Sequence, residues 1–140
     1  MSEVVEKPSL PTPTPVVNTD TEEFWAATAE GRLLLRRCNS CGEAMWYPRP
    51  ICPSCHSVET SWEEASGLGR IYSFTIIRRP AGAYAGADPY VFAYVELAEG
   101  PRMLTNIVDC DPITLEVDQE VEVVFHKTED AMALPRFRPR

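Results

Sequence analysis

The sequence predicts a mainly β protein with an N-terminal helix, a small metal-stapled segment and a small closed or nearly closed barrel. One observation is that four of the five cysteines fall in two Cys-x-x-Cys pairs with ten residues between them. The other is that short runs with an apolar residue at every second position follow Gly67 and Gly69, with turn signals between the runs. With 140 residues, of which 44% are hydrophobic, the chain can bury one modest core.

The N-terminal residues 1–18 are predicted to form a disordered or partner-bound arm. They show no hydrophobic period, and their PTPTP run favours an extended, polyproline-like backbone. The segment has no apolar run that could serve as the core of a signal peptide, and no later stretch approaches the roughly 20 apolar residues that a membrane span needs. We therefore expect a cytoplasmic protein without a membrane partner.

Residues 19–37 are predicted to contain a helix and a lead-in strand. Thr19 with Glu22 three residues later fits a capping box, and Gly31 is placed as a helix terminator. Between them, aromatic residues and alanines give a possible apolar face. The run from Leu33 to Arg37 then resembles a short strand that leads into the first cysteine pair.

Residues 38–66 are predicted to form a metal-binding ribbon. Each Cys-x-x-Cys turn can aim two sulfurs at one point, and two such turns complete a tetrahedron of soft ligands. We therefore assign zinc to Cys38, Cys41, Cys52 and Cys55, with iron as the second choice because a tetrathiolate also binds iron. Four sulfurs fill all four positions, so the metal is expected to be structural.

Two other readings of the cysteines are weaker. The run CPSCH matches the attachment motif of c-type haem, but that chemistry belongs to exported proteins and would leave Cys38 and Cys41 without a role. A redox disulfide would require a thioredoxin-like βαβ context, which the sequence lacks. The fifth cysteine, Cys110, lies between Asp109 and Asp111, and their charges disfavour a reactive thiolate.

No catalytic centre is predicted. The two histidines, His56 and His126, lie in no motif of a nucleophile, base or metal site and are interpreted as surface or packing residues. The carboxylates are scattered along predicted strands and turns, so nothing marks a pair as an acid and base couple. The chain alone is therefore not expected to be an enzyme.

Residues 67–140 are predicted to form the barrel. In RIYSFTII, Tyr72, Phe74 and Ile76 alternate with polar residues, which predicts that these three form the buried face of a strand. Further strands are predicted at YVFAYVEL (90–97), which is apolar on both faces, at MLTNIV (103–108) and at VEVVF (121–125). The connection 78–89 is long and rich in Gly and Ala, as functional or mobile loops often are.

These segments together resemble a known family. From Phe24 onward, EGRLLLRRC, CGEAMWYPRPICPSC, SGLGRIYSFT, PYVFAYVEL, TNIV, VEVVF and LPRFRP occur in the order found in proteins with a rubredoxin-like zinc ribbon and an OB-fold that accompany thiolase-superfamily enzymes. The resemblance implies an OB-fold for the barrel. It also implies a noncatalytic subunit that docks on a thiolase-like partner, which performs thiolytic or retro-aldol chemistry, and helps form the site for the acyl-CoA substrate.

Contacts with acyl-CoA or with the partner are expected in two segments. Between the cysteine pairs, Pro48 and Pro50 stiffen a loop of residue types that are enriched in interface hot spots, although its aromatic residues could equally pack the ribbon onto the barrel. In the connection 78–89, small residues would let the loop close over a pantetheine arm, with arginines at one mouth. The candidate contacts are Trp46, Tyr47, Arg49, Arg78, Arg79 and Tyr84.

A nucleic-acid-binding module is the rival function, because OB-folds and zinc ribbons both serve that role. The strand aromatics could stack on bases, but the strands lack the interleaved Lys and Arg that a backbone-tracking groove requires. The formal net charge of −8 would also repel a phosphate backbone. We therefore expect these aromatics to form the core or a pocket wall: Tyr72, Phe74, Tyr90, Phe92 and Tyr94.

Overall fold

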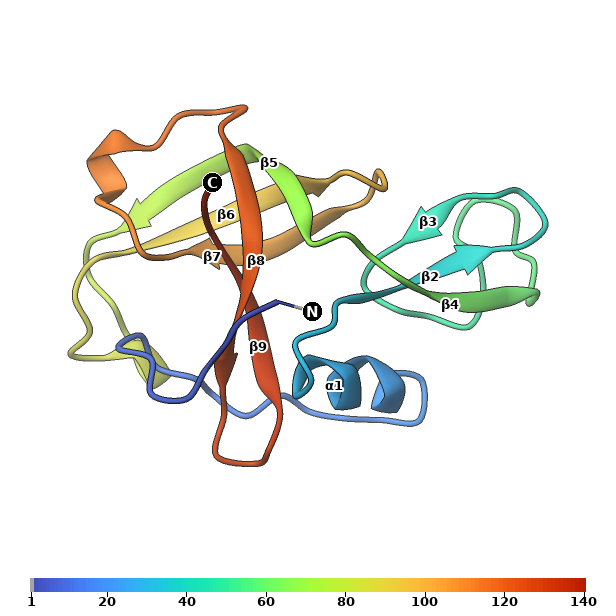
Figure 1. The fold of residues 1–140 in the computed structure, drawn as a ribbon, viewed down its shortest axis with the longest axis horizontal. Coiled ribbons are helices and arrows are strands. Elements are labelled where there is room, and N and C mark those ends of the chain that lie inside the picture. Colours follow the sequence, from blue (N-terminus) through green and yellow to red (C-terminus); the bar gives the residue numbers. More distant parts are fainter. Residues whose placement is uncertain (1) are drawn as a thin grey trace.

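A computed structural model describes residues 2–140. It shows two β modules at opposite ends of the long axis, with one helix between them (Figure 1). The smaller module is a three-stranded ribbon, and the larger is a closed barrel. The predicted mainly β fold with one helix, a ribbon and an OB-like barrel is confirmed. Within residues 2–140, no helix has the length and apolar composition needed to cross a membrane.

The ribbon is a three-stranded antiparallel sheet in the order β3-β2-β4. Strand β2 (Leu34–Cys38) pairs with β3 (Ala44–Met45) on one side and with β4 (Thr60–Glu64) on the other. The predicted lead-in strand is thus confirmed to within one residue, and it ends at the first cysteine. Because β2 is the central strand, it holds both edges of the ribbon in register around the cysteine turns.

The barrel strands are β5 (Leu68–Ile77), β6 (Tyr90–Leu97), β7 (Arg102–Ile107), β8 (Glu120–Lys127) and β9 (Ala133–Pro139). They follow the order β8-β5-β6-β7-β9, and β8 pairs with β9 to close the ring. Strand β9 was not predicted as a strand. The β7–β9 seam holds a single residue pair, Ile107 with Phe137. Two short 3-10 helices, η1 (Gly82–Tyr84) and η2 (Pro112–Thr114), lie in the connections.

Side chains alternate between the two sides of β8 and β6, and this alternation determines which residues form the barrel core. Val121, Val123 and Phe125 of β8 are buried, as predicted. In β6, every second residue from Val91 to Leu97 is buried, while Phe92 and Tyr94 point outward. The apolar residues on the outer side of β6 are therefore not part of the core.

The predicted buried face of β5 was wrong at its first position. The pairing of β5 with β6 shifts register between Ile71 and Ser73, so the strand carries a bulge at Tyr72. Ile71 is fully buried, whereas the Tyr72 side chain is 48% exposed. A bulge adds one residue and reverses the alternation, which moves Tyr72 to the outside.

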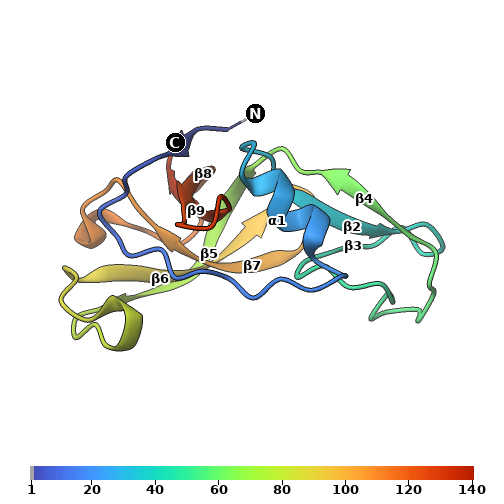
Figure 2. The same ribbon diagram turned by 90° about the horizontal axis from the view of Figure 1, so that it is seen from below.

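The helix α1 (Glu22–Thr28) lies between the ribbon and the barrel (Figure 2). Its N-cap is Thr21 and not the predicted Thr19, because the Trp25 amide donates the first helical hydrogen bond to the Thr21 carbonyl, at 3.0 Å. The Thr21 side chain bonds to Asn18 and does not cap the helix. The helix buries Phe24 and Trp25 and packs on β9 and β2. The Thr28 hydroxyl accepts a hydrogen bond of 3.1 Å from the Ala133 amide, which ties the helix to β9.

The N-terminal arm lies on the barrel of its own chain, which differs from the expected disordered or partner-bound arm. Its first strand, β1 (Val4–Val5), pairs in parallel with β8. Before it, the Ser2 amide donates to the Gly31 carbonyl at 2.8 Å. Gly31 has a φ of +75°, and a Cβ there would lie 2.2 Å from the Ser2 carbonyl oxygen, so glycine is required beside the arm. The extended backbone leaves carbonyls free to accept hydrogen bonds from the barrel.

Candidate metal centre and adjoining aromatic groove

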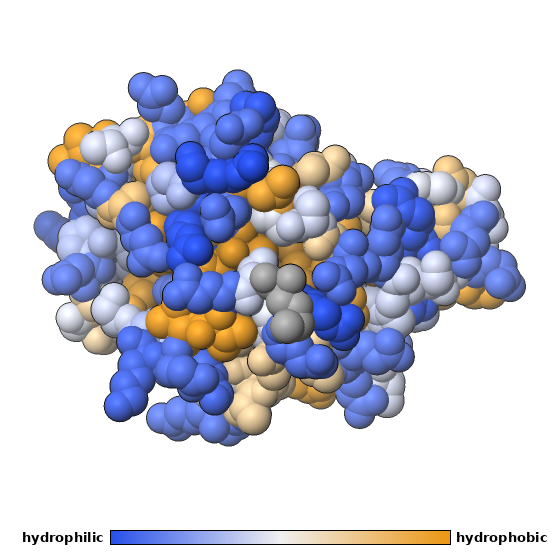
Figure 3. Space-filling model, viewed as in Figure 1, coloured by the Kyte–Doolittle hydropathy of each residue, from blue (hydrophilic) through white to orange (hydrophobic). Residues whose placement is uncertain are grey.

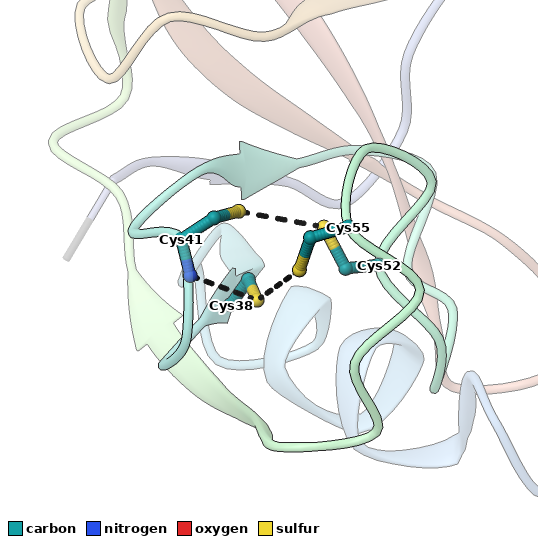
Figure 4. Close-up of side chains that lie close together, drawn as sticks. All are labelled: Cys38, Cys41, Cys52 and Cys55. Atoms are coloured by element: carbon teal, nitrogen blue, oxygen red, sulfur yellow. Dashed lines mark hydrogen bonds between the residues drawn. The ribbon is translucent and has the colours of Figure 1, made fainter.

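The four cysteines of the two pairs converge on one point of the ribbon. The ligand atoms of Cys38, Cys41, Cys52 and Cys55 all lie within 4.8 Å of one another, and Figure 4 shows the two turns facing each other. The Sγ atoms of Cys38 and Cys55 are 3.5 Å apart, and those of Cys41 and Cys52 are 3.7 Å apart. Both distances are far longer than a disulfide bond of about 2.05 Å.

These sulfur separations fit a tetrahedral metal site. A Zn–S bond of about 2.3 Å in a tetrahedron places neighbouring sulfurs about 3.8 Å apart. Two of the thiols are buried and two are exposed, so the site lies at the ribbon surface with one side closed. Within residues 2–140, these four cysteines therefore form a cluster of thiols that could hold a metal ion.

The two cysteine turns have the same local backbone geometry. The Gly42 amide donates to the Cys38 carbonyl, and the His56 amide donates to the Cys52 carbonyl, each at 2.9 Å. Gly42 and His56 occupy the same place in their turns, and both have positive φ values of 81° and 64°. The Cys41 amide also points at the Cys38 sulfur at 3.5 Å, and this hydrogen bond lowers the pKa of the Cys38 thiol to about 6. The pKa values of the Cys41 and Cys55 thiols are raised instead, so a metal would have to displace their protons to bind all four sulfurs as thiolates.

An apolar groove adjoins the ribbon where the barrel seam meets helix α1. It has a volume of about 260 Å³. The groove lies at the seam between β7 and β9, where the backbone ladder of hydrogen bonds is incomplete and a side chain joins the two strands. The Thr105 hydroxyl donates to the Pro135 carbonyl at 3.0 Å. The walls are mostly apolar and include Trp25, Trp46, Tyr47, Phe92, Leu104 and Leu134.

Trp46 and Tyr47 pack the ribbon onto the helix and also form the groove wall. The Trp25 indole N–H donates to the Tyr47 hydroxyl at 2.9 Å. The ring centroids of Trp46 and Tyr47 are 5.1 Å apart and nearly perpendicular, and both rings contact Phe24. Within residues 2–140, the buried Trp46 indole N–H has no acceptor. A buried donor without an acceptor costs free energy.

Arg136 lies at the barrel seam beside the groove and is only 1% exposed. Its guanidinium donates to the Leu10 and Pro11 carbonyls of the arm at 3.3 and 2.5 Å. The remaining bonds go to the side chains of Asn106, His126 and Tyr84, at 3.2, 2.9 and 3.2 Å. All five partners are neutral, and burial lowers the pKa of Arg136. Sequence reasoning missed this residue, because no pattern marks a buried arginine.

His126 is held in its neutral form by this environment. The ring is 5% exposed, and its Nδ1 lies 2.9 Å from the Arg136 guanidinium, which requires Nδ1 to accept. Burial and then the positive charge of Arg136 lower the pKa of His126 to about 4. The interpretation of His126 as a packing residue therefore fits, and His56 lies exposed at the ribbon surface.

The remaining predicted contact residues do not gather at one place. Arg49 is exposed on the ribbon, whereas Arg78 and Arg79 are exposed at the end of β5, on the opposite end of the long axis (Figure 1). Tyr84 stacks on Tyr90 with centroids 4.9 Å apart and reaches Arg136. The structure thus brings Trp46 and Tyr47 to the groove, and places the three arginines outside it.

The surroundings of Cys110 disfavour a reactive thiolate, as the sequence indicated. It is partly buried and packs against the core. Burial raises the pKa of its thiol, and the charges of Asp109 and Asp111 raise it further. A thiol with a raised pKa is a poor nucleophile at neutral pH.

Comparisons with known proteins agree with both modules. The model of the ChsH2 rubredoxin-like zinc ribbon domain matches residues 25–59, and that of the ChsH2 C-terminal OB-fold domain matches residues 62–126. A solved structure described as "Ltp2-ChsH2(DUF35) aldolase" superposes with a TM-score of 0.80 and 35% identity, over 90% of this chain and 98% of that chain.

Several curated relatives carry names of acyl-CoA enzymes or scaffolds. A "DUF35 domain-containing scaffold protein" of Methanothermobacter thermautotrophicus is 42% identical over 80% of this chain and 86% of its own length. The "Benzoylsuccinyl-CoA thiolase subunit BbsA" of Geobacter metallireducens is 34% identical over 64% of this chain and 58% of its own length.

The "Probable enoyl-CoA hydratase alpha subunit" of Thermomonospora curvata is 35% identical over 96% of this chain. The match spans only 42% of that relative's own length. The relatives therefore share the module and differ in the reaction that their names describe. Because both halves of the module match in order, this chain belongs to the ChsH2 (DUF35) family of zinc-ribbon and OB-fold proteins.

Proposed function

We propose that the chain is a noncatalytic accessory subunit of a thiolase-superfamily enzyme complex and helps form the binding site for an acyl-CoA substrate. The observation that carries the proposal is the match, over 90% of the chain and at 35% identity, to a chain of an aldolase complex. The name of a thiolase subunit among the relatives supports a partner of that superfamily. The partner would supply the nucleophile and base for carbon–carbon bond cleavage or formation.

The proposed metal is a structural zinc held by Cys38, Cys41, Cys52 and Cys55. When bound, zinc would supply folding free energy to a ribbon that has only a small core of its own, Cys38, Met45 and Cys52. Four protein thiolates leave no coordination position for an activated water, which separates this site from catalytic zinc sites. We infer a reducing cytoplasm because such thiols remain free there.

The groove beside the ribbon supports a role in acyl-CoA binding. Its walls are mainly aromatic and aliphatic, as expected for the channel of a pantetheine arm, and Asn106 and Tyr47 supply polar groups. Its volume of about 260 Å³ is below that of a complete ligand site, so the partner is proposed to supply the other wall. Arg49, at the end of the same loop, is proposed to meet an anionic group at the mouth.

Paired cations along the outer face of the barrel sheet argue against the nucleic-acid-binding alternative. Arg70 pairs with Glu120 and Arg102 pairs with Glu96, each at 3.0 Å, along the outer face of the barrel sheet. A groove that follows a phosphate backbone needs cations that are free to replace counterions. We therefore favour the accessory subunit.

The test is reconstitution. The chain should be coexpressed with the thiolase-superfamily protein encoded beside it, and the purified complex assayed with a panel of acyl-CoA esters. We expect turnover by the complex and none by the chain alone, and Cys110→Ala should leave the rate of the complex unchanged. Turnover by the isolated chain, or its purification with nucleic acid and no enzyme, would contradict the proposal.

A further inference from the structure

We propose that the outer face of the barrel sheet is the surface that docks the enzyme subunit, and that it binds a neutral, apolar protein surface. The aromatic face consists of Tyr72 on β5, Phe92 and Tyr94 on β6, and Leu104 on β7. Their side chains are 48%, 42%, 46% and 40% exposed. This inference rests on the proposed function, because it names where the partner binds.

The strand register places the four side chains side by side. Tyr94 pairs with Leu104 across β6 and β7, and with Ser73 across β5 and β6. Phe92 is two residues from Tyr94 on the same side of β6. The bulge at Tyr72 turns this ring outward beside them. A shallow depression of about 200 Å³ runs between Phe74, Phe92, Tyr94 and Leu104.

The exposed apolar area is comparable to the largest apolar patch on a typical monomeric protein, about 300–600 Å². Side chains of this size bury about 150–250 Å² each, so fractions near 45% leave about 350 Å² of the aromatic face in contact with water. Isolated exposed apolar residues are ordinary, but the largest contiguous apolar patch of a protein is often functional. On the side of the molecule that carries β8 and the arm, hydrophilic residues predominate around smaller hydrophobic patches (Figure 3).

Charge at the border of the aromatic face selects a neutral partner. The Arg102 guanidinium lies 3.8 Å from the centroid of the Tyr72 ring and is paired with Glu96 at 3.0 Å. The next cation along β5, Arg70, is paired with Glu120 at 3.0 Å. At this end of the aromatic face the border is thus polar with its charges paired, and the centre is aromatic, as in protein interfaces with a hot-spot core.

The aromatic face continues into the groove. Phe92 and Leu104 line both the shallow depression and the groove that holds Trp46 and Tyr47. A stable interface buries about 800 Å² on each partner, which is more than the aromatic face alone offers. We infer that the enzyme subunit covers the aromatic face and the groove together, and so reaches the ribbon.

The test is the affinity of the chain for the coexpressed thiolase-superfamily subunit. The Phe92→Ser/Tyr94→Ser variant should weaken binding by at least about 30-fold, the effect of one hot spot. The control is Ile113→Ser/Val117→Ser in the β7–β8 connection, which removes two apolar side chains that are 79% and 57% exposed. We expect this control to bind within about twofold of wild type, as surface positions away from an interface do.

Two additions keep the outcomes distinct. Leu104→Lys, on the adjacent strand, places a charge in the same face and decides the question if the double variant fails to fold by circular dichroism. If the wild type binds the subunit and both face variants bind equally well, the docking surface lies elsewhere and the proposed function stands. If the wild type does not bind, the proposed function itself fails. If the main effect of the face variants is loss of self-association, the aromatic face binds a second copy of the chain and not the enzyme. If the main effect is loss of binding to a labelled oligothymidylate, the face binds nucleic acid.

Discussion

The buried guanidinium of Arg136 is expected to hold the N-terminal arm and the barrel seam together, and Arg136→Met tests this. Methionine fills part of the volume but donates no hydrogen bond. The arm carbonyls of Leu10 and Pro11 would lose their donors and could regain water by detaching. The acceptors on His126, Asn106 and Tyr84 would remain near the seam without a partner.

The magnitude follows from these acceptors. Each buried acceptor that loses its donor costs about 1–3 kcal/mol, and part of this is offset because the buried charge is removed. We expect a net loss of about 3 kcal/mol in the free energy of unfolding. For a chain of this size that is a fall of roughly 10 °C in Tm.

The assays are urea unfolding of the zinc-loaded protein and limited proteolysis of the arm, residues 2–18. The matched control is Arg138→Met on the same strand, since Arg138 also reaches the arm, at Glu3, but is more exposed and pairs with surface carboxylates. We expect that control to cost less than about 1 kcal/mol and to leave the arm protected from cleavage. If Arg136→Met is as stable as wild type and its arm stays protected, β1 pairing alone holds the arm and the reasoning is refuted.

Three further predictions concern the metal, pH and substrate. Cys41→Ser should abolish stoichiometric zinc in elemental analysis and weaken partner binding while the circular dichroism of the barrel persists; stoichiometric iron in wild type would contradict the zinc assignment. The pKa of His126 is about 4 in the folded state and about 6.5 when unfolded, so its contribution to stability is complete above pH 6.5 and is lost as the pH falls towards 4. Wild type should therefore lose up to about 3 kcal/mol more than His126→Asn between pH 7 and 4, measured by urea unfolding. Arg49→Ala should raise the KM for acyl-CoA in the complex more than the double variant Arg78→Ala/Arg79→Ala does. The reason is that Arg49 lies two residues from the groove residue Tyr47. Equal KM values for the two variants would show that Arg49 does not belong to the site.

The aromatic residues of the sheet show why sequence periodicity predicts where strands lie better than it predicts which face of a strand is buried. The strands β5, β6, β7 and β8 were predicted because apolar residues recur within short runs. In β6 both faces are apolar, so the pattern does not say which face is buried. In β5 the bulge reverses the alternation at Tyr72, and a bulge has no signal in a period-two pattern. The exposed aromatic face therefore could not be derived from the sequence.

The cysteine cluster is the part of this protein that the sequence by itself determined. Two Cys-x-x-Cys turns set the direction of their sulfurs locally, so the spacing alone predicts four thiols around one point. The burial of Arg136, the position of the arm and the groove beside Trp46 were decided only by the tertiary structure. They depend on contacts between residues more than 100 positions apart, such as Arg136 with Pro11, and on the incomplete seam between β7 and β9. Such contacts are selected by the packing of whole strands, because a buried charge is tolerated only where several distant acceptors meet it.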